Sequence, residues 1–366
     1  MIPLVDLHAQ YMSMKSEIDK AVGRCISQSH FIKGEDVARF EDSFAEYLGI
    51  KHCAGCGNGT DALEIILKAL SIGPGDEVIV PALSWISTAE SVNSAGAEPV
   101  FADIKESTFS IDPEKLERLI TPKTKVILPV HLYGCPADMD EIMSIAKEHD
   151  LYVVEDCAQA HGAIYKGKKV GTFGIASAFS FFPTKNLGAY GDAGAIVTDD
   201  PDILEKARRI SNHGQLNQKH QHDFTARNSR LDTMQAAVLE VKLRYLDSWN
   251  AKRIYLAGLY KERLSGLTDL NLPVTSEGRT HVFHLFVIRT KKRETLIVSL
   301  NKNEIGWSIH YPHPLPHLKA YKYKSHVIGD FPVSEKVCNE IISLPLYPEL
   351  SEDQVDKICK TIIDSY

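Results

Sequence analysis

The chain has 366 residues, of which 44% are hydrophobic and 24% are charged, an ordinary composition for a folded protein. Its net charge of -7 and the lack of a lysine- or arginine-rich run argue against a nucleic-acid partner. No apolar stretch reaches the ~20 residues that a membrane-spanning helix needs, no secretory signal is visible, and the seven cysteines fit reduced thiols. We therefore expect a cytoplasmic protein that does not enter a membrane.

Strands and helices alternate between about residues 50 and 200. Runs rich in β-branched and aromatic residues predict strands at 77–80, 99–103, 125–130, 151–156, 177–182 and 194–198. Helices are predicted between them, at 63–70, 85–95, 113–120 and 139–149. This βαβ order predicts an α/β fold, with a mostly parallel sheet between helices on both faces.

The rest of the chain predicts a second, smaller unit. Helical periodicity runs from Leu231 through Leu264, which suggests one long helix leading out of the large domain. Strands are expected at 281–288 and 307–310, and helices at 294–300, 334–342 and 351–363. We expect a large domain at 1–250 and a small C-terminal α+β domain at 251–366, although no Pro/Gly/Ser-rich linker marks the boundary.

Asp156 and Lys185 carry the strongest chemical signal. Asp156 ends one predicted strand, and Lys185 follows the next. Ligands of open α/β sheets bind beyond the carboxyl ends of the strands, so both side chains should face one crevice. A carboxylate and a lysine suit pyridoxal phosphate, which needs its ring nitrogen protonated and its aldehyde held by a lysine. The alternative is a structural ion pair with a surface lysine.

Two further segments fit a cofactor site. Residues 58–64 form a small-residue turn that opens a helix and could bind an anion. Asp61 and Glu64 also have capping-box spacing, so a well-capped helix is the alternative. Trp85 follows a strand and could stack on a planar ring, or be part of the core.

Other motifs are weaker. The glycines at 55–59 miss the G-x-G-x-x-G spacing of a dinucleotide site. Cys53 and Cys56 form a lone C-x-x-C pair, for which two small buried residues is the favoured interpretation. Two histidine groups, at 213–222 and 310–317, lack the spacing of a ligand set, and we expect no metal.

Taken in order, these segments resemble the DegT/DnrJ/EryC1/StrS family of pyridoxal-phosphate-dependent sugar aminotransferases. The resemblance covers nearly the whole chain and is carried by the motifs at 2–7, 31–34, 58–63, 155–159, 180–188, 191–195, 228–232, 310–312 and 344–348. The family implies a fold-type I aminotransferase architecture and an active site shared across a homodimer.

The resemblance also implies roles for individual residues. Lys185 would bind the cofactor as a Schiff base and move the proton, Asp156 would pair with the ring nitrogen, Gln159 would contact the ring hydroxyl, and Trp85 would stack on the ring. The phosphate would be held by Gly59, Thr60 and Ser180 of the same subunit and by Asn228 of the partner subunit. A lysine at 185 disfavours the dehydratase members, which carry histidine there.

The family further implies L-glutamate as amino donor and a nucleotide-linked keto sugar as acceptor, in deoxyamino-sugar or surface-polysaccharide synthesis. Phe182 and the segment 186–188 resemble the branch that aminates the 3-position. We expect a dTDP-3-keto-6-deoxyhexose; the alternatives are a UDP-3-keto-N-acetylhexuronate, a 4-keto sugar, or a non-nucleotide ketone such as a cyclitol. Candidates for the sugar pocket are Lys33, Arg227, Arg230, His310 and Tyr311. A regulator that binds pyridoxal phosphate is the non-enzyme alternative.

Overall fold

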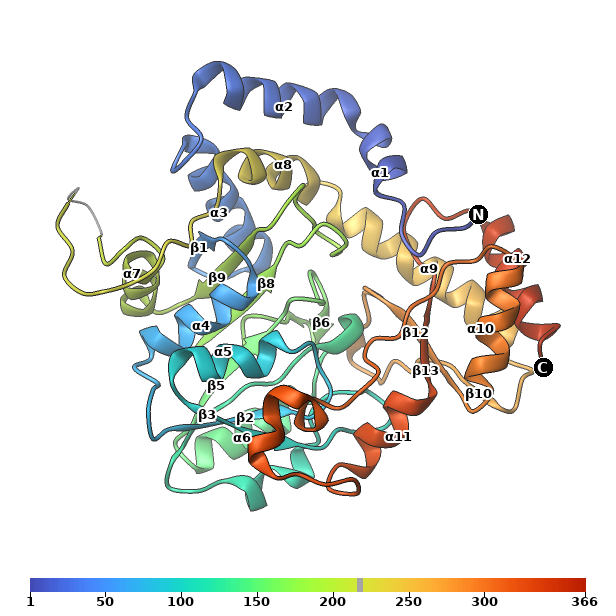
Figure 1. Ribbon diagram of the computed structural model, residues 1–366. Helices are drawn as coiled ribbons and strands as arrows, with labels where there is room; N and C mark the ends of the chain where they lie inside the picture. The colour runs from blue at the N-terminus through green and yellow to red at the C-terminus, as the bar shows by residue number, and fades with distance from the viewer. Residues whose placement is uncertain (216–219) are drawn as a thin grey trace.

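A seven-stranded sheet forms the centre of the computed structural model, which describes residues 1–215 and 220–366 (Figure 1). Its strands are β1 (His52–Cys56), β2 (Glu77–Pro81), β3 (Glu98–Ala102), β4 (Thr124–Ile127), β5 (Tyr152–Asp156), β8 (Ala176–Ser180) and β9 (Gly194–Thr198). They lie in the order β1-β9-β8-β5-β4-β2-β3. The pairs from β3 to β8 are parallel, and β9 is antiparallel to both its neighbours. The predicted mostly parallel sheet is confirmed.

Helices cover both faces of this sheet, as the βαβ order predicts. One core contains residues of α4 (Gly59–Ala69), α5 (Ser87–Ala95) and α7 (Pro201–Ile210), and the other contains residues of α3 (Glu35–Leu48), α6 (Met139–Glu148) and α8 (Thr233–Leu243). Within β2, Val78 and Val80 pack in the first core and Ile79 in the second. Both faces of a central strand must therefore be apolar, and each such buried side chain contributes roughly 1.5–3 kcal/mol.

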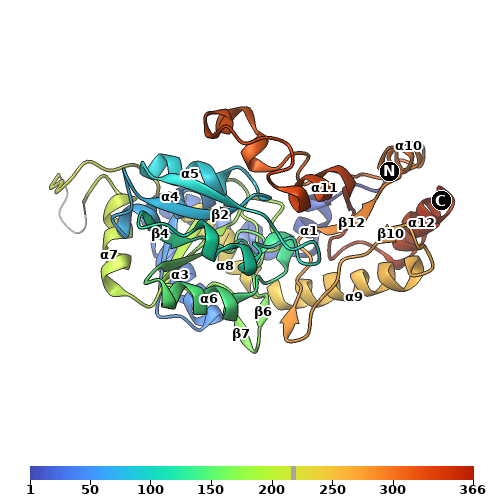
Figure 2. The same ribbon diagram turned by 90° about the horizontal axis from the view of Figure 1, so that it is seen from below.

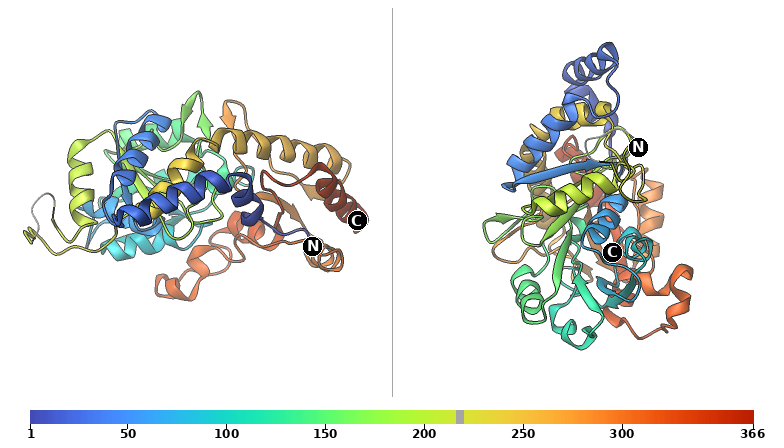
Figure 3. Two further views of the ribbon diagram at one scale, coloured as in Figure 1. Left: turned by 90° about the horizontal axis from the view of Figure 1, so that it is seen from above. Right: turned by 90° about the vertical axis from the view of Figure 1, so that its left-hand side faces the viewer.

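Two N-terminal helices, α1 (Leu7–Ser13) and α2 (Lys15–Gln28), lie at the edge of the molecule. Ile18, Ala21 and Cys25 of α2 pack against Ala237 and Val241 of α8. Figure 3 shows α2 running along the outside of α8, with its other side turned away from the body of the molecule.

A second lobe follows α9 (Leu246–Leu264), which extends from the large sheet to the other end of the molecule (Figure 2). This lobe is built from β10 (Leu270–Asn271), β12 (Phe286–Thr290), β13 (Ile341–Leu344), α10 (Arg293–Lys302), α11 (Pro332–Glu340) and α12 (Glu352–Ile363). β12 pairs antiparallel with β10 and β13. Ile2 packs in the same core, so the first residues of the chain join this lobe. The division at residue 250 falls inside α9 and stays a prediction.

The remaining elements are short. They are β6 (Ile164–Tyr165), β7 (Lys168–Lys169) and β11 (Arg279–Thr280), which form a small sheet, and the 3₁₀ turns at Pro113–Lys115, Glu117–Leu119, Leu132–Gly134, Leu315–His317 and Lys319–Lys324.

Five predicted elements differ clearly in the structure. The helix expected at 334–342 ends at Glu340, and β13 begins at Ile341. The long helix of 231–264 is two helices, because α8 ends at Leu243 and α9 begins at Leu246. The strand expected from 281 begins only at Phe286, because Val282 and Leu285 donate backbone hydrogen bonds to Gly134 and Tyr133 instead of to a strand. The helix at 113–120 is two 3₁₀ turns, and the strand at 307–310 is a single bridge through Ser308.

Within the described residues, no helix combines the length and the apolar character needed to cross a membrane.

Candidate active site

A cavity of about 580 Å³ opens beyond the carboxyl ends of β5 and β8 and beside the N-terminus of α4. Both Asp156 and Lys185 line it, together with seven more of the residues that the sequence singled out: Gly59, Thr60, Trp85, Gln159, Ser180, His310 and Tyr311. A cavity of this size, with a few polar groups that converge on apolar walls, is typical of a small-molecule site.

Asp156 is the last residue of β5, and its carboxylate is buried. It accepts hydrogen bonds from the Thr88 hydroxyl at 3.0 Å and from the backbone N–H of Ala158 at 3.1 Å. Burial raises the pKa of this carboxyl, while the two hydrogen bonds and the charge of Lys185 oppose the rise. A buried carboxylate with one cation nearby is suited to pair with a protonated ring nitrogen.

Thr88 was not found by sequence analysis. It lies in the first turn of α5, where a small polar residue is ordinary, and only the folded chain brings its hydroxyl to Asp156. Ser84 lies 2.8 Å from the Thr88 hydroxyl. Because Thr88 gives its proton to Asp156, Ser84 must be the donor in this second bond.

Lys185 lies in the loop 181–189, which the backbone bond from Ala189 N–H to the Phe181 carbonyl closes at 2.8 Å. Burial lowers the pKa of the Lys185 amine to about 8, and Asp156 opposes the shift. Its Nζ lies 3.5 Å from Nε2 of His284, a residue that sequence analysis also missed.

Burial lowers the pKa of three histidines that also feel the charge of this amine. The value falls to about 3 for His161, to about 4 for His310, and well below the ordinary range for His284; in each case the charge of Lys185 adds to the effect of burial. All three are therefore neutral near pH 7, which leaves Lys185 as the group whose proton can be exchanged there.

The N-terminus of α4 also lines the cavity. Asn58 caps the helix by accepting a hydrogen bond from Asp61 N–H at 2.8 Å, so Asn58 and not Asp61 is the capping residue. A Cβ on Gly59 would lie 2.6 Å from the Cβ of Ser180, so only glycine fits. The free N–H groups of α4, together with the hydroxyls of Thr60 and Ser180, offer the donors that an anionic group needs.

Gln159 lies between two tyrosines. Its Oε1 accepts a hydrogen bond from the backbone N–H of Tyr133 at 2.8 Å, and its Nε2 donates to the hydroxyl of Tyr311 at 3.1 Å. Trp85 has its ring centroid 5.5 Å from that of Tyr311, and its side chain is half exposed. These aromatic and amide groups form a wall against which a planar ring could lie.

The donor set of this cavity fits pyridoxal phosphate. An amine with a lowered pKa, a buried carboxylate, a helix N-terminus whose glycine leaves room for an anion, and an aromatic wall lie around one space. Lys185, Asp156, the start of α4 and Trp85 would then hold the aldehyde, the ring nitrogen, the phosphate and the ring face, respectively.

The other predicted site residues lie elsewhere in this chain. Lys33 and Arg230 line a second cavity of about 290 Å³ with Arg208, and it shares no residue with the first. Partial burial and the charges of Arg230 and Arg208 lower the pKa of Lys33, which indicates crowded positive charge. Arg227 forms ion pairs with Asp61 and Glu64, and Asn228 is exposed outside both cavities.

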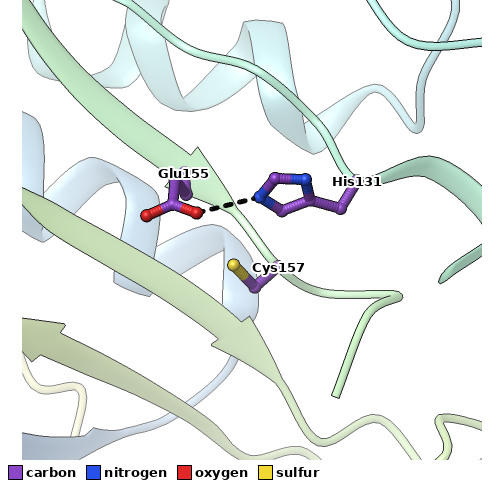
Figure 4. A group of neighbouring side chains, drawn as sticks. All are labelled: His131, Glu155 and Cys157. Carbon is purple, nitrogen blue, oxygen red and sulfur yellow. Dashed lines mark hydrogen bonds and ion pairs between the residues drawn. The ribbon is translucent and has the colours of Figure 1, made fainter. Parts of the chain in front are cut away.

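A buried cluster of His131, Glu155 and Cys157 has the composition of a metal site (Figure 4). The ligand atoms of His131 and Glu155 are already engaged, however. His131 Nδ1 accepts a hydrogen bond from Ala137 N–H, so its Nε2 carries the proton and donates to Glu155 at 3.0 Å. Glu155 also accepts three backbone N–H groups between Gly171 and Gly174. The cluster therefore supports the end of β5 and the neighbouring loop.

Cys53 and Cys56 are both buried free thiols, which agrees with the structural interpretation of the C-x-x-C pair.

Comparison with known proteins places these features in one family. Residues 12–363 match the DegT/DnrJ/EryC1/StrS aminotransferase family. The chain is 46% identical to a pleiotropic regulatory protein of Geobacillus stearothermophilus, covering 100% of this chain and 98% of the other. It is 42% identical to the dTDP-3-amino-3,4,6-trideoxy-alpha-D-glucose transaminase of Streptomyces venezuelae, covering 99% and 95%. It is 44% identical to the UDP-N-acetyl-3-dehydro-alpha-D-glucosamine 3-aminotransferase of Acidithiobacillus ferrooxidans, covering 99% and 97%.

A solved structure supports the same assignment. The crystal structure of DesV from S. venezuelae, in complex with a ketimine intermediate, superposes with a TM-score of 0.97 at 42% identity and covers 99% of this chain and 98% of that one. The architecture is that of the fold-type I aminotransferases. The chain belongs to the DegT/DnrJ/EryC1/StrS aminotransferase family.

Proposed function

We propose that this protein is a pyridoxal-phosphate-dependent aminotransferase that moves the amino group of L-glutamate to the 3-position of a keto sugar linked to a nucleotide. The observation that carries the proposal is the pairing of Lys185 and Asp156 in one cavity, at the N-terminus of α4. When bound, pyridoxal phosphate supplies an electron sink that lets an amino group leave one carbon and join another.

Lys185 would move the proton. General acid–base catalysis works best when the pKa of the group lies near the working pH, and burial brings the pKa of this amine to about 8. The neutral histidines around it do not compete for the proton at that pH. Asp156 would keep its partner nitrogen protonated, since a buried carboxylate is stabilised by the cation that it faces.

The 3-position is supported by two relatives of similar identity, both of which are named for amination at carbon 3. Phe182, which lines the cavity, is the local residue that favours this branch. The sugars in the names of these two relatives are linked to different nucleotides, dTDP in one and UDP in the other. Our first candidate is a dTDP-3-keto-6-deoxyhexose, and the alternative is a UDP-linked 3-keto sugar such as an N-acetylhexuronate.

The second cavity supports a shared site. Lys33, Arg208 and Arg230 line it together with Glu41, which pairs with Arg208, and arginine binds the oxygens of a diphosphate in pairs. Within one chain these residues line a different cavity from Lys185. We propose that in a homodimer they would contact the nucleotide diphosphate bound at the partner's active site. Asn228 and Arg227 would lie at the same interface between the two subunits.

A regulatory protein that binds the cofactor without turnover is the second candidate, because one relative is named for pleiotropic regulation. The two candidates differ in a half-reaction with glutamate. We expect wild-type protein loaded with pyridoxal phosphate to convert glutamate to its 2-oxo acid, with a matching change in the visible absorbance of the cofactor. Lys185→Ala should lose both. Conversion by Lys185→Ala, or none by the wild type, would overturn the proposal.

A further inference from the structure

The loop that carries Lys185 is held by buried polar side chains from helices much later in the chain. These contacts join Gly188 to Lys242 and Asn186 to Asn250, across sequence separations of 54 and 64 residues. None of them involves the walls of the cofactor cavity directly.

The first contact comes from α8. Lys242 is 0% exposed, and its Nζ donates a hydrogen bond of 2.7 Å to the carbonyl of Gly188 while lying 4.2 Å from the centroid of the Tyr190 ring. Burial lowers the pKa of this amine to about 7. The charge of Glu349 has the opposite but smaller effect. Burying a lysine is costly, and among the described residues no carboxylate forms an ion pair with Lys242, so the hydrogen bond to Gly188 is the contact that this amine makes at the loop.

The second contact comes from α9. Asn186, the neighbour of Lys185, is 2% exposed, and its Nδ2 donates to Asn250 Oδ1 at 2.8 Å and to the Val282 carbonyl at 2.9 Å. Asn250 in turn donates from its own Nδ2 to the His161 carbonyl at 2.8 Å. Asn186 therefore ties the lysine loop to α9 and to the segment that carries His284.

The loop needs such support because its own backbone contacts are few. Lys185 N–H bonds to the Phe182 carbonyl at 2.9 Å, and Ala189 N–H bonds to the Phe181 carbonyl at 2.8 Å. A Cβ on Gly188 would lie 2.3 Å from the Pro183 carbonyl oxygen, so the loop folds tightly back on itself. In this tight turn the Gly188 carbonyl points to Lys242, while the Lys185 side chain enters the cavity.

We propose that Lys242 and Asn250 are positioning residues, which fix the loop so that the Lys185 amine stays at its reacting position. The catalytic consequence rests on the proposed function, whereas the ordering of the loop does not. A displacement of about 1 Å at a reacting group can lower the rate ~100-fold. We therefore expect a fall in kcat on the order of 10- to 100-fold, with the KM for the nucleotide sugar nearly unchanged.

The test uses Lys242→Met, which keeps the length of the side chain but removes its donor. Lys206→Met is the matched control, because Lys206 is an exposed lysine on another helix. Asn250→Ser provides a second, independent variant that shortens the side chain away from Asn186. Amide hydrogen exchange of segment 181–189 is measured first in protein without cofactor, and kinetics follow in the loaded enzyme.

The proposal expects faster exchange in 181–189 for both Lys242→Met and Asn250→Ser, with wild-type exchange for Lys206→Met. A lower melting temperature accompanied by unchanged exchange in this loop and unchanged kcat would overturn it. Faster loop exchange in a protein whose wild type shows no transamination would support the positioning role and count against the proposed function alone. The two failures are therefore distinguishable.

Discussion

The hydroxyl of Thr88 donates a hydrogen bond of 3.0 Å to the carboxylate of Asp156, and both groups are buried. This contact fixes the carboxylate in one orientation and favours its charged form, against the effect of burial on its pKa. Hydrogen bonds to charged groups contribute roughly 1.5–3 kcal/mol, about twice the value of neutral ones. By favouring the charged carboxylate, Thr88 therefore strengthens the binding of any cation that pairs with Asp156.

Replacing Thr88 by valine keeps the shape of the side chain and removes the donor. We expect the affinity for pyridoxal phosphate to fall at least ~10-fold, in line with the loss of ~1.5 kcal/mol or more. Fluorescence titration of the cofactor-free protein measures this change. Thr88→Ser retains the hydroxyl and should stay close to wild type; equal losses in the two variants would show that the methyl group, not the hydrogen bond, is what counts.

The amine of Lys185 should titrate near pH 8 in protein without cofactor, instead of at the ordinary value of 10.5. Because the folded pKa is lowered, the unfolded chain binds more protons between pH 8 and 10.5, and this group favours the native state increasingly as pH rises through that window. Labelling of Lys185 with an amine reagent should therefore reach half its maximal rate near pH 8. A midpoint for Lys185 at the ordinary lysine value of 10.5 would contradict the effect of burial.

The shared-site proposal predicts complementation between two impaired variants. Lys185→Ala lacks the reacting amine, and Arg230→Ala lacks a cation of the second cavity. If each active site takes Lys185 from one subunit and Arg230 from the other, a mixed dimer has one intact site. Equal amounts exchanged at random should recover about a quarter of wild-type activity. Recovery no greater than the sum of the separate variants would place both residues in the same site of one chain.

Gly59→Ala tests the close approach of α4 to Ser180. The new Cβ would lie 2.6 Å from Ser180 Cβ, so one of the two segments must shift, at a cost of roughly 1–3 kcal/mol. We expect a weaker affinity for pyridoxal phosphate and a lower free energy of unfolding, measured by cofactor titration and by denaturant unfolding. Gly23→Ala, on α2, has nothing within 4 Å of the new Cβ and should not lower either quantity.

The central sheet and the pairing of Asp156 with Lys185 could be predicted from sequence because both depend on local patterns. Apolar runs of strand length identify β5 and β8, and the end of a parallel strand marks the edge at which ligands bind. Thr88, His284 and Lys242 carry no comparable signal, since their roles arise from segments that meet only in the folded chain.

The helix predicted at 231–264 is a second case in which the sequence pattern did not predict the structure. Its periodicity and lack of breakers are those of one helix, yet the chain turns between Leu243 and Leu246. On either side of that turn, Lys242 reaches Gly188 and Asn250 reaches Asn186. Tertiary contacts of this kind override the local preference for a continuous helix, and they are not visible in sequence spacing.

The most direct test of this account is the position of the amine in the product. The loaded enzyme is given L-glutamate and either a 3-keto or a 4-keto nucleotide sugar, with dTDP and UDP forms run in parallel, and the product is examined by NMR. We predict transfer to carbon 3 of the 3-keto sugar, with one nucleotide clearly preferred. Turnover of the 4-keto sugar alone, with the amine at carbon 4, would contradict the proposed function.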